Sequence, residues 1–373
     1  MRTRIAIACQ GGGSQTAFTA GALAGLAEAG ALEEFEITGL SGTSGGAVCA
    51  ALVWFAAKRQ EPLTERLLGF WRDNTAQTFA EHMSNDLMVS WLRMVNKGFL
   101  PTVAIAPGSP LMQVMAKYAD FANLAIGQRR QFTDFPTLLR RHIDFEQTAR
   151  WGAQPSAPVL IIGACSVLSG RLTKFISARE PIKIEHILGS CAVPNLFTAV
   201  ESDGDAYWDG LFSDNPPIDS LVRPSLVGSE NIPAEIWVIK VNPTRRDTIP
   251  QQVDDVTDRR NQLEGNVSLF QNLKYLELLN DLLVQGAFKH GYLEGFFSEP
   301  VRIPKAFRDD PDKPYHIPWI EMSAATQRTL DYEGKLDRSR SNIEGLIAEG
   351  RARARQFLAD RAAVVRAPGK TRS

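Results

Sequence analysis

The sequence predicts an α/β fold with three layers, in which a mostly parallel central sheet is flanked by helices on both faces. Two segments near the N-terminus each predict a strand, a glycine-rich turn and a helix in direct succession. Residues 158–167 form an uninterrupted apolar run, which is typical of a strand buried on both faces in a parallel sheet. Strands that alternate with helices favour such a sheet.

The first of these segments begins with an apolar strand at residues 4–9 and continues into a helix over 16–29. Between them lies a loop containing Gly11, Gly12 and Gly13, which gathers backbone N–H groups around one point. A dinucleotide-binding loop is a poor fit, because its third glycine would fall at Thr16. We expect the three glycines to form an oxyanion hole. A tight turn that binds nothing is the alternative.

The second segment contains a G-x-S-x-G turn centred on Ser44. Residues 35–40 predict the strand before it and residues 47–58 the helix after it. Such a turn exposes its serine hydroxyl above the sheet, and small neighbours prevent collisions with the strand and helix. Ser44 is therefore the candidate nucleophile. The elbow around it consists of Gly42, Thr43, Gly45 and Gly46. The alternative is a glycine-rich turn with an incidental serine.

The remaining elements are predicted from apolar spacing and from the positions of proline. Residues 60–150 predict a helical insertion, in which the apolar positions of 86–112 fit core helices better than a lid or a lipid-facing surface. Further strands are expected at 172–177 and 235–241, beside the central strand at 158–167. Helices are expected at 184–190, 262–288 and 336–358, and a loop with a short strand at 315–317 is expected within 300–318. The basic end of the last helix is expected to be solvated.

We expect one domain over residues 1–373. Its motif-bearing core covers about 4–220, and a C-terminal helical extension covers about 251–360.

Composition and charge limit the function. The net charge of −1 gives no support to a nucleic-acid partner. Four scattered cysteines and five isolated histidines argue against a disulfide framework or a metal site, and we expect no metal and no cofactor. The first apolar segment is too short for a signal peptide, and no run is long enough to span a membrane. A cytoplasmic protein is therefore expected, with peripheral membrane contact as an open alternative.

Together the two glycine motifs resemble those of the patatin-like phospholipase family. That family carries a downstream Asp-Gly motif, which is present here as Asp209-Gly210, and residues 189–194 resemble the small-residue and proline block that precedes it. The similarity spans about residues 4–220. It implies a lipid acyl hydrolase in which Asp209 acts as the general base for Ser44, an acyl-enzyme forms on Ser44, and the substrate is a lipid or phospholipid. The oligomeric state is not implied.

The sequence departs from the family pattern at three positions. Gln15 stands where the family usually has a basic residue, Gln10 stands where it often has aspartate, and Leu211 replaces a small residue. A neutral amide at position 15 donates a hydrogen bond but carries no charge, which weakens the expectation that this loop recognises phosphate.

Three other interpretations remain open. The order Ser44, Asp209, His290 would suit a catalytic triad, although His290 lacks a recognisable motif, and we favour the dyad. The chain could instead be a non-catalytic protein that binds lipid or a partner, or an esterase or thioesterase acting on soluble acyl esters. For either enzyme we expect Ser44 and Asp209 to end two strands at the same edge of a parallel sheet.

Overall fold

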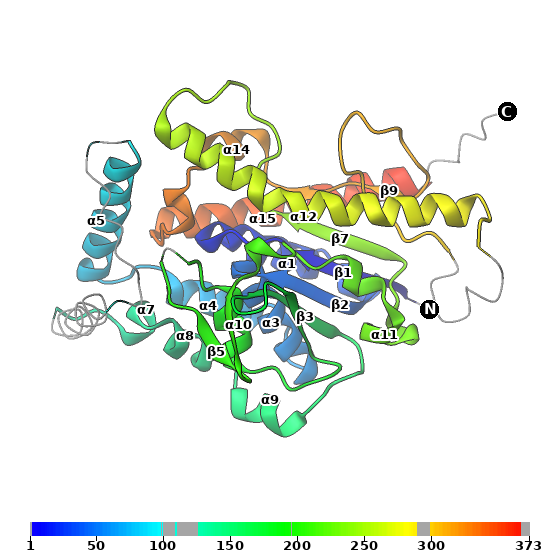
Figure 1. Ribbon diagram of the computed structural model, residues 1–373, viewed down its shortest axis with the longest axis horizontal. Helices are drawn as coiled ribbons and strands as arrows, with labels where there is room; N and C mark the ends of the chain where they lie inside the picture. Colours follow the sequence, from blue (N-terminus) through cyan, green and yellow to red (C-terminus); the bar gives the residue numbers. More distant parts are fainter. Residues whose placement is uncertain are drawn as a thin grey trace.

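A mostly parallel β-sheet forms the middle layer of the computed structural model, which describes residues 2–97, 99, 109, 126–194, 196–288 and 299–366 (Figure 1). The strands follow the order β10–β7–β1–β2–β3–β6–β5, and β4 also pairs with β3. Strands β10, β7, β1, β2 and β3 run parallel to one another, whereas β4 and β6 run antiparallel to β3. The sheet strands are β1 (Thr3–Cys9), β2 (Phe35–Thr43), β3 (Val159–Ser166), β4 (Leu172–Ile176), β5 (Val200–Ser202), β6 (Asp205–Asp209), β7 (Glu235–Lys240) and β10 (Ile320–Glu321).

Helices cover both faces of this sheet, as the sequence predicts. The α-helices are α1 (Ala17–Glu28), α2 (Ala31–Glu34), α3 (Gly45–Lys58), α4 (Glu65–Asn74), α5 (Phe79–Asn96), α7 (Arg130–Thr133), α8 (Phe135–His142), α9 (Phe145–Trp151), α10 (Ile184–Ser190), α11 (Pro224–Val227), α12 (Val253–Val284), α14 (Ala324–Thr329) and α15 (Arg340–Arg366). A separate ladder pairs β8 (Ile303–Pro304) with β9 (His316–Ile317). Among the described helices, none combines the length and apolar content needed to cross a bilayer.

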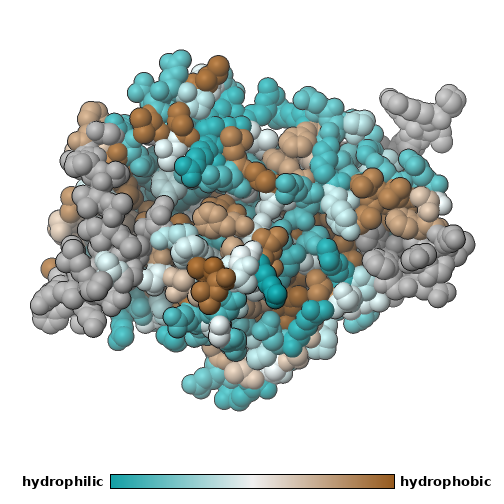
Figure 2. Space-filling view, in the orientation of Figure 1, coloured by the Kyte–Doolittle hydropathy of each residue, from teal (hydrophilic) through white to brown (hydrophobic). Residues whose placement is uncertain are grey.

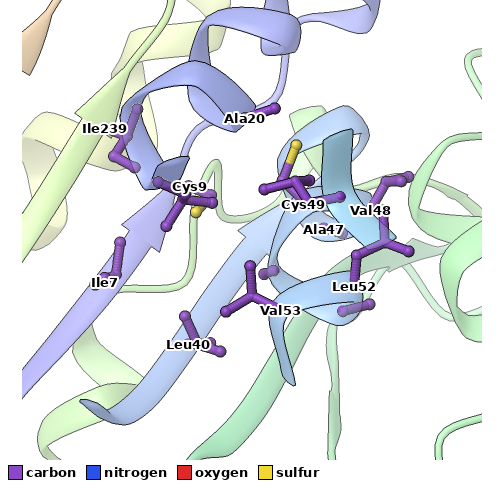
Figure 3. Packing of buried hydrophobic residues seen from close by; sticks show 14 of the residues in the cluster. Ile7, Cys9, Ala20, Leu40, Ala47, Val48, Cys49, Leu52, Val53 and Ile239 are labelled. Atoms are coloured by element: carbon purple, nitrogen blue, oxygen red, sulfur yellow. The ribbon is translucent and has the colours of Figure 1, made fainter. Parts of the chain in front are cut away.

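The alternation of side chains along the strands builds two cores. In β1, Ile5 and Ile7 join the core under α1, α3 and α15, whereas Ala6 and Ala8 join the core under α12. Figure 3 shows part of the first core, where Val53 of α3 lies next to Leu40 of β2. The sheet is therefore buried on both faces, which explains its continuous apolar strands.

Helices α1 and α15 pack unusually closely on one face of the sheet. A Cβ atom at Gly21 of α1 would lie 2.1 Å from the carbonyl oxygen of Ile347, and one at Gly350 of α15 would lie 2.2 Å from that of Phe18. Small residues at both positions therefore allow the two backbones to approach.

The basic end of α15 is not simply solvated. Arg361 forms two hydrogen bonds of 2.6 Å to the carboxylate of Glu235 in β7, and Glu235 has no exposed surface. The expectation of a solvated helix end is wrong for this residue, because a buried carboxylate requires a charged partner. The pair fastens the C-terminal helix to the sheet.

Most predicted strands and helices are confirmed within a few residues. The predicted helix at 262–288 begins earlier, at Val253, and the predicted helix at 336–358 is α15. The β5–β6 hairpin was not predicted. Its turn, Asp203-Gly204, has positive φ angles of 54° and 81°, and an Asp-Gly pair between two strands is the available signal.

Helix α5 has the reverse of the expected amphipathic arrangement. Its buried face carries Glu81, Asn85 and Val89, and Glu81 pairs with Arg129 at 2.8 Å. The expectation of core helices is wrong for this part of residues 86–112, since the opposite face of α5 is apolar and exposed. Residues 98, 100–108 and 110–112 lie outside the described part. The exposed apolar side chains of α5 are Phe79, Met83, Leu87, Met88, Trp91 and Met94.

Two glycine substitutions in α15 should have opposite effects on stability. Gly350→Ala should destabilise the protein by roughly 1–3 kcal/mol, because its new methyl group would collide with the backbone of α1. Gly345→Ala is the matched control, since nothing lies within 4 Å of the added Cβ. It should stabilise the helix by roughly 0.5–1 kcal/mol. Denaturant unfolding of both variants tests this, and equal effects would contradict the close packing.

Candidate active site

Ser44 and Asp209 lie together because two strands end against the same edge of β3. Residues 161–163 of β3 pair with β2 on one side and β4 on the other, and residues 164–165 pair with both β4 and β6. Since a strand residue has one neighbour on each side, β6 lies on the same side as β2. Thr43 pairs with Gly163 of β3, and Asp209 pairs with Ala164, the next residue along β3. The two strand ends therefore meet.

This arrangement corrects the expectation that both residues end parallel strands. Strand β6 runs antiparallel to β3, and it is also antiparallel to β5, with which it forms a hairpin. The carboxylate and the hydroxyl consequently approach from opposite directions along one edge, rather than side by side from the same direction.

The backbone of Ser44 is strained in the way that a nucleophile elbow requires. Its φ and ψ angles are 55° and −132°, a region that residues with a side chain rarely occupy. Its N–H donates to the Ser190 hydroxyl at 2.9 Å, and that hydroxyl donates to the carbonyl of Gly163 at 2.7 Å. Thr43 is fixed by a 2.5 Å bond from its hydroxyl to the Asp214 carbonyl. These bonds hold the strained turn against β3.

The glycines of the predicted elbow lie at close backbone contacts. A Cβ at Gly45 would lie 2.2 Å from the Thr16 hydroxyl oxygen, and one at Gly46 would lie 2.2 Å from the Cys9 carbonyl oxygen. A Cβ at Gly42 would lie 2.5 Å from the carbonyl oxygen of Gly46. The elbow therefore leaves no room for larger residues at these three positions.

Asp209 is buried, with an exposed fraction of 2%. Burial raises the pKa of its carboxyl from 3.8 to about 6, although the hydrogen bond from the Leu211 N–H, the nearby Ser44 side chain and the charge of Lys335 each lower it. The bond from Leu211 measures 2.8 Å. The carboxylate is thus ionised near neutral pH and is still a better proton acceptor than an exposed aspartate.

The glycine loop presents two N–H groups that are not already bonded. The N–H of Gly11 donates to the Asn215 side-chain oxygen at 2.7 Å, which removes it from the predicted set of oxyanion donors. Within the described part of the chain, the N–H groups of Gly12 and Gly13 donate to no protein atom. Any oxyanion hole built from this loop therefore uses Gly12 and Gly13.

A cavity of about 860 Å³ opens over these groups. Its walls include Ser44, Asp209 and the glycine loop, together with residues of α8, α12 and the segment 332–338. This volume is in the range that accommodates an organic ligand. A larger hollow of about 1390 Å³ beside α14 has none of the predicted site residues on its walls.

Sequence reasoning missed several residues that complete the site. Ser190 lies in the block noted at 189–194, but no local pattern gives its contact with Ser44. Asn215, Asn242 and Lys335 reach the site from distant parts of the chain.

The two glutamines that depart from the family pattern have structural partners. The side-chain oxygen of Gln10 accepts the N–H groups of Val241 and Asn242 at 2.9 Å each, and its amide nitrogen donates to the carbonyl of Gly265. An aspartate could not donate that last bond. The amide of Gln15 donates to the carbonyl of Asp331 at 2.9 Å.

The rival triad has no support from the described structure, since His290 lies outside the described residues. Within the described part of the chain, no three His, Cys, Asp or Glu side chains are grouped so as to bind a metal ion.

Comparisons with known proteins give a family match and similar solved structures, two of which are described below. A family model for patatin-like phospholipase matches residues 7–222. VipD from Legionella pneumophila is 16% identical, with a TM-score of 0.40, over 96% of this chain and 67% of that chain. The heterodimeric complex ExoU–SpcU from the type III secretion system of Pseudomonas aeruginosa is 16% identical, with a TM-score of 0.24. That match covers 80% of this chain and 57% of the other. No curated protein sequence matches the chain.

Replacing the buried carboxyl should make the protein more stable in a pH-dependent way. Because the folded state binds the Asp209 proton more tightly than the unfolded state, this group contributes less stability as pH rises through about 6. Asp209→Asn should therefore be more stable than the wild-type protein at about pH 8, by up to about 3 kcal/mol, and the difference should shrink toward about pH 4. Thermal unfolding at several pH values tests this. A difference that does not change with pH would contradict the raised pKa.

Proposed function

The chain belongs to the patatin-like phospholipase family, whose members are lipid acyl hydrolases, and on this premise we propose that it hydrolyses lipid carboxylic esters through a Ser44–Asp209 dyad. The observation that carries this proposal is the position of the Ser44 side chain beside the buried carboxylate of Asp209, whose pKa it lowers, on the wall of a large cavity. A serine hydroxyl needs an adjacent base to act as a nucleophile at neutral pH, and Asp209 is such a base.

In the first step, Asp209 accepts the proton of the Ser44 hydroxyl as its oxygen attacks the ester carbonyl. The negative charge that develops on the carbonyl oxygen is stabilised by the N–H groups of Gly12 and Gly13, with that of Gly45 at the start of α3 as a third donor. Collapse of the tetrahedral intermediate breaks the ester bond, and the proton on Asp209 passes to the leaving alcohol.

In the second step, Asp209 removes a proton from water, which attacks the acyl group on Ser44. A second tetrahedral intermediate forms in the same hole and collapses to a free fatty acid. The proton returns to the Ser44 oxygen, which restores the enzyme. One carboxylate serves as base and acid in turn, so the mechanism needs no histidine.

Contact with a membrane surface is the second part of the proposal, and α5 supports it. The helix stands at one end of the molecule (Figure 1) and exposes its apolar face, including Leu87 and Trp91, with exposed fractions of 64% and 55%. Met88 of the same helix also lines the cavity. A lipid surface is the partner that would both cover this face and deliver the substrate beside it.

Apolar side chains at the cavity wall continue this surface. Leu196, Phe197 and Phe212 line the cavity and are also exposed to solvent. Figure 2 shows apolar side chains gathered on the face of the molecule where α10 and β5 lie in Figure 1, among more hydrophilic neighbours. A cavity with an apolar rim is suited to acyl chains that leave a bilayer.

Two other functions are distinguished by simple assays. A non-catalytic lipid- or partner-binding protein would leave Ser44 unreactive toward a fluorophosphonate probe. An esterase or thioesterase for soluble acyl esters would show no preference for long acyl chains and would not bind vesicles, whereas the apolar rim and the face of α5 favour a lipid substrate.

Removing either member of the dyad should abolish ester hydrolysis. Ser44→Ala and Asp209→Ala should each lower kcat/KM by about four orders of magnitude or more without unfolding the protein, and Ser44→Ala should lose fluorophosphonate labelling. Full activity in Asp209→Ala would refute the dyad.

For the wild-type enzyme, kcat/KM should decrease about tenfold per pH unit below about 6, because protonated Asp209 cannot act as a base.

Polar substitutions on the exposed face of α5 should weaken membrane binding. The double substitution Leu87→Gln and Trp91→Gln should lower partitioning onto phospholipid vesicles by about tenfold or more, because less apolar surface would leave water. Val284→Gln, which alters an exposed residue at the far end of α12, is the control and should leave partitioning unchanged (Figure 1). Hydrolysis of a soluble nitrophenyl ester should be unaffected in both. Unchanged vesicle binding in the α5 variant would contradict the proposal, and a change from dimer to monomer would assign the face to a second copy.

A further inference from the structure

We propose that Lys335 binds the phosphate group of the substrate in the active-site cavity, so that a segment outside the family-matched region selects phosphate-bearing lipids over neutral glycerides. This inference rests on the proposed function, because it concerns the same cavity. It assigns a specificity-determining role to a residue more than a hundred positions beyond the end of the match at residue 222.

The segment 331–335 is packed directly against the glycine loop. Gln15, whose exposed fraction is 2%, donates to the carbonyl of Asp331 at 2.9 Å. The Asp331 carboxylate accepts the N–H of Gly334 at 2.7 Å and so closes the turn before Lys335. A Cβ at Gly13 would lie 2.3 Å from the Lys335 carbonyl oxygen. The neutral residue at position 15 thus anchors the turn that brings a cation to the cavity.

The ammonium group of Lys335 has unused hydrogen-bonding capacity. It is partly buried on the cavity wall, and its Nζ donates to the Asn242 side-chain oxygen at 3.3 Å. Among the described residues, it makes no second hydrogen bond and has no carboxylate within 4.0 Å. An ammonium group has three donors. Burial lowers the pKa of Lys335, and the carboxylates of Asp258, Asp209 and Glu264, which favour its charged form from beyond 4.0 Å, do not fully offset this effect. A negatively charged group in the cavity would satisfy both requirements.

Asn242 keeps Lys335 in the cavity and away from the catalytic base. Its own N–H donates to Gln10 at 2.9 Å, and its side-chain amide donates to the Gly11 carbonyl at 3.3 Å. Lys335 is near enough to Asp209 for its charge to lower the pKa of that carboxyl, but the two groups do not form an ion pair within 4.0 Å. A direct ion pair would make Asp209 a weaker base. The ammonium therefore remains available for the substrate.

The other two cations on the cavity wall are already engaged. Arg260 pairs with Glu264 at 2.7 Å. The Arg338 guanidinium lies 3.7 Å above the Phe132 ring and donates to the Phe132 carbonyl at 2.7 Å. Arg338 is thus held against Phe132 and adds positive potential to the wall, whereas Lys335 belongs to the turn that packs against the glycine loop.

Phosphate is the anion that best fits this position. An ester lipid with its carbonyl at Gly12 and Gly13 carries its only permanent negative charge in the headgroup, a few bonds from the ester, and phosphate oxygens accept several charge-assisted hydrogen bonds. Free phosphate offers the same chemistry, so the experiment must separate the two sources.

The test compares Lys335→Met and Lys335→Arg with the wild-type enzyme on two substrates that share their acyl chains, phosphatidic acid and diacylglycerol, in mixed micelles at about pH 7.5. Lys335→Met should lower kcat/KM for phosphatidic acid by roughly ten- to hundredfold, mainly through KM, and leave diacylglycerol within about threefold. Lys335→Arg should recover most of the loss. Arg328→Met removes an exposed cation outside the cavity and should not change the preference.

A binding measurement separates failure of this inference from failure of the proposed function. In the Ser44→Ala background, dihexanoyl phosphatidic acid should bind, and Lys335→Met should weaken its Kd by the same roughly ten- to hundredfold. Inorganic phosphate should bind much more weakly.

Equal losses on both substrates, or a Kd that does not depend on Lys335, would overturn the inference while leaving the dyad intact. Equally tight binding of inorganic phosphate would also overturn it and would assign the site to a soluble anion. Binding that depends on Lys335 without hydrolysis by the wild-type protein would overturn the proposed function alone.

Discussion

The edge of β3 where β2 and β6 meet leaves almost no space for side chains, and the rest of the site depends on this constraint. A Cβ at Gly210 would lie 2.4 Å from the carbonyl oxygen of Gly163, and one at Gly163 would lie 2.8 Å from the Thr43 hydroxyl oxygen. Because glycine occupies these positions, two strand ends from distant parts of the chain come into contact. That contact brings the Ser44 side chain close enough to the Asp209 carboxylate to lower its pKa.

This arrangement imposes unfavourable energies on the folded state. Ser44 has a strained backbone conformation, and Asp209 is a buried acid with few compensating partners. Two apolar cores, one on each face of the sheet, supply the stability that offsets them, and Ser190 and Asn215 fix the elbow and the glycine loop. The same features that lower stability give a reactive serine and a base with a raised pKa, which is the expected relation between stability and activity at an enzyme site.

The parts of the molecule that the sequence predicts are those encoded by local patterns. The strand–glycine–helix segments around Gly11 and Ser44 need only neighbouring residues, and their positions were predicted closely. The contacts of Gln15 with Asp331 and of Glu235 with Arg361 were not predicted, because each joins residues far apart in the chain. No periodicity carries such information. Asn242 and residues within 260–264 and 332–338 therefore complete a cavity whose motifs all lie before residue 211.

Helix α5 shows a second limit of sequence reasoning. Apolar residues at helical spacing normally indicate a buried face, yet here the buried face carries Glu81, which pairs with Arg129, and the apolar face is exposed. Periodicity reports that a helix has two unlike faces but not which face packs inward. The assignment requires a partner for the polar face, and that partner lies 48 residues away.

The most direct test of the central claim is a double-mutant cycle for ester hydrolysis with Ser44→Ala, Asp209→Ala and the combined variant. If the hydroxyl and the carboxylate work as one unit, the double variant should have the same residual kcat/KM as the single Ser44 variant, because a base without its nucleophile contributes nothing. Losses that multiply in the double variant would mean that the two residues act independently, and they would contradict the dyad.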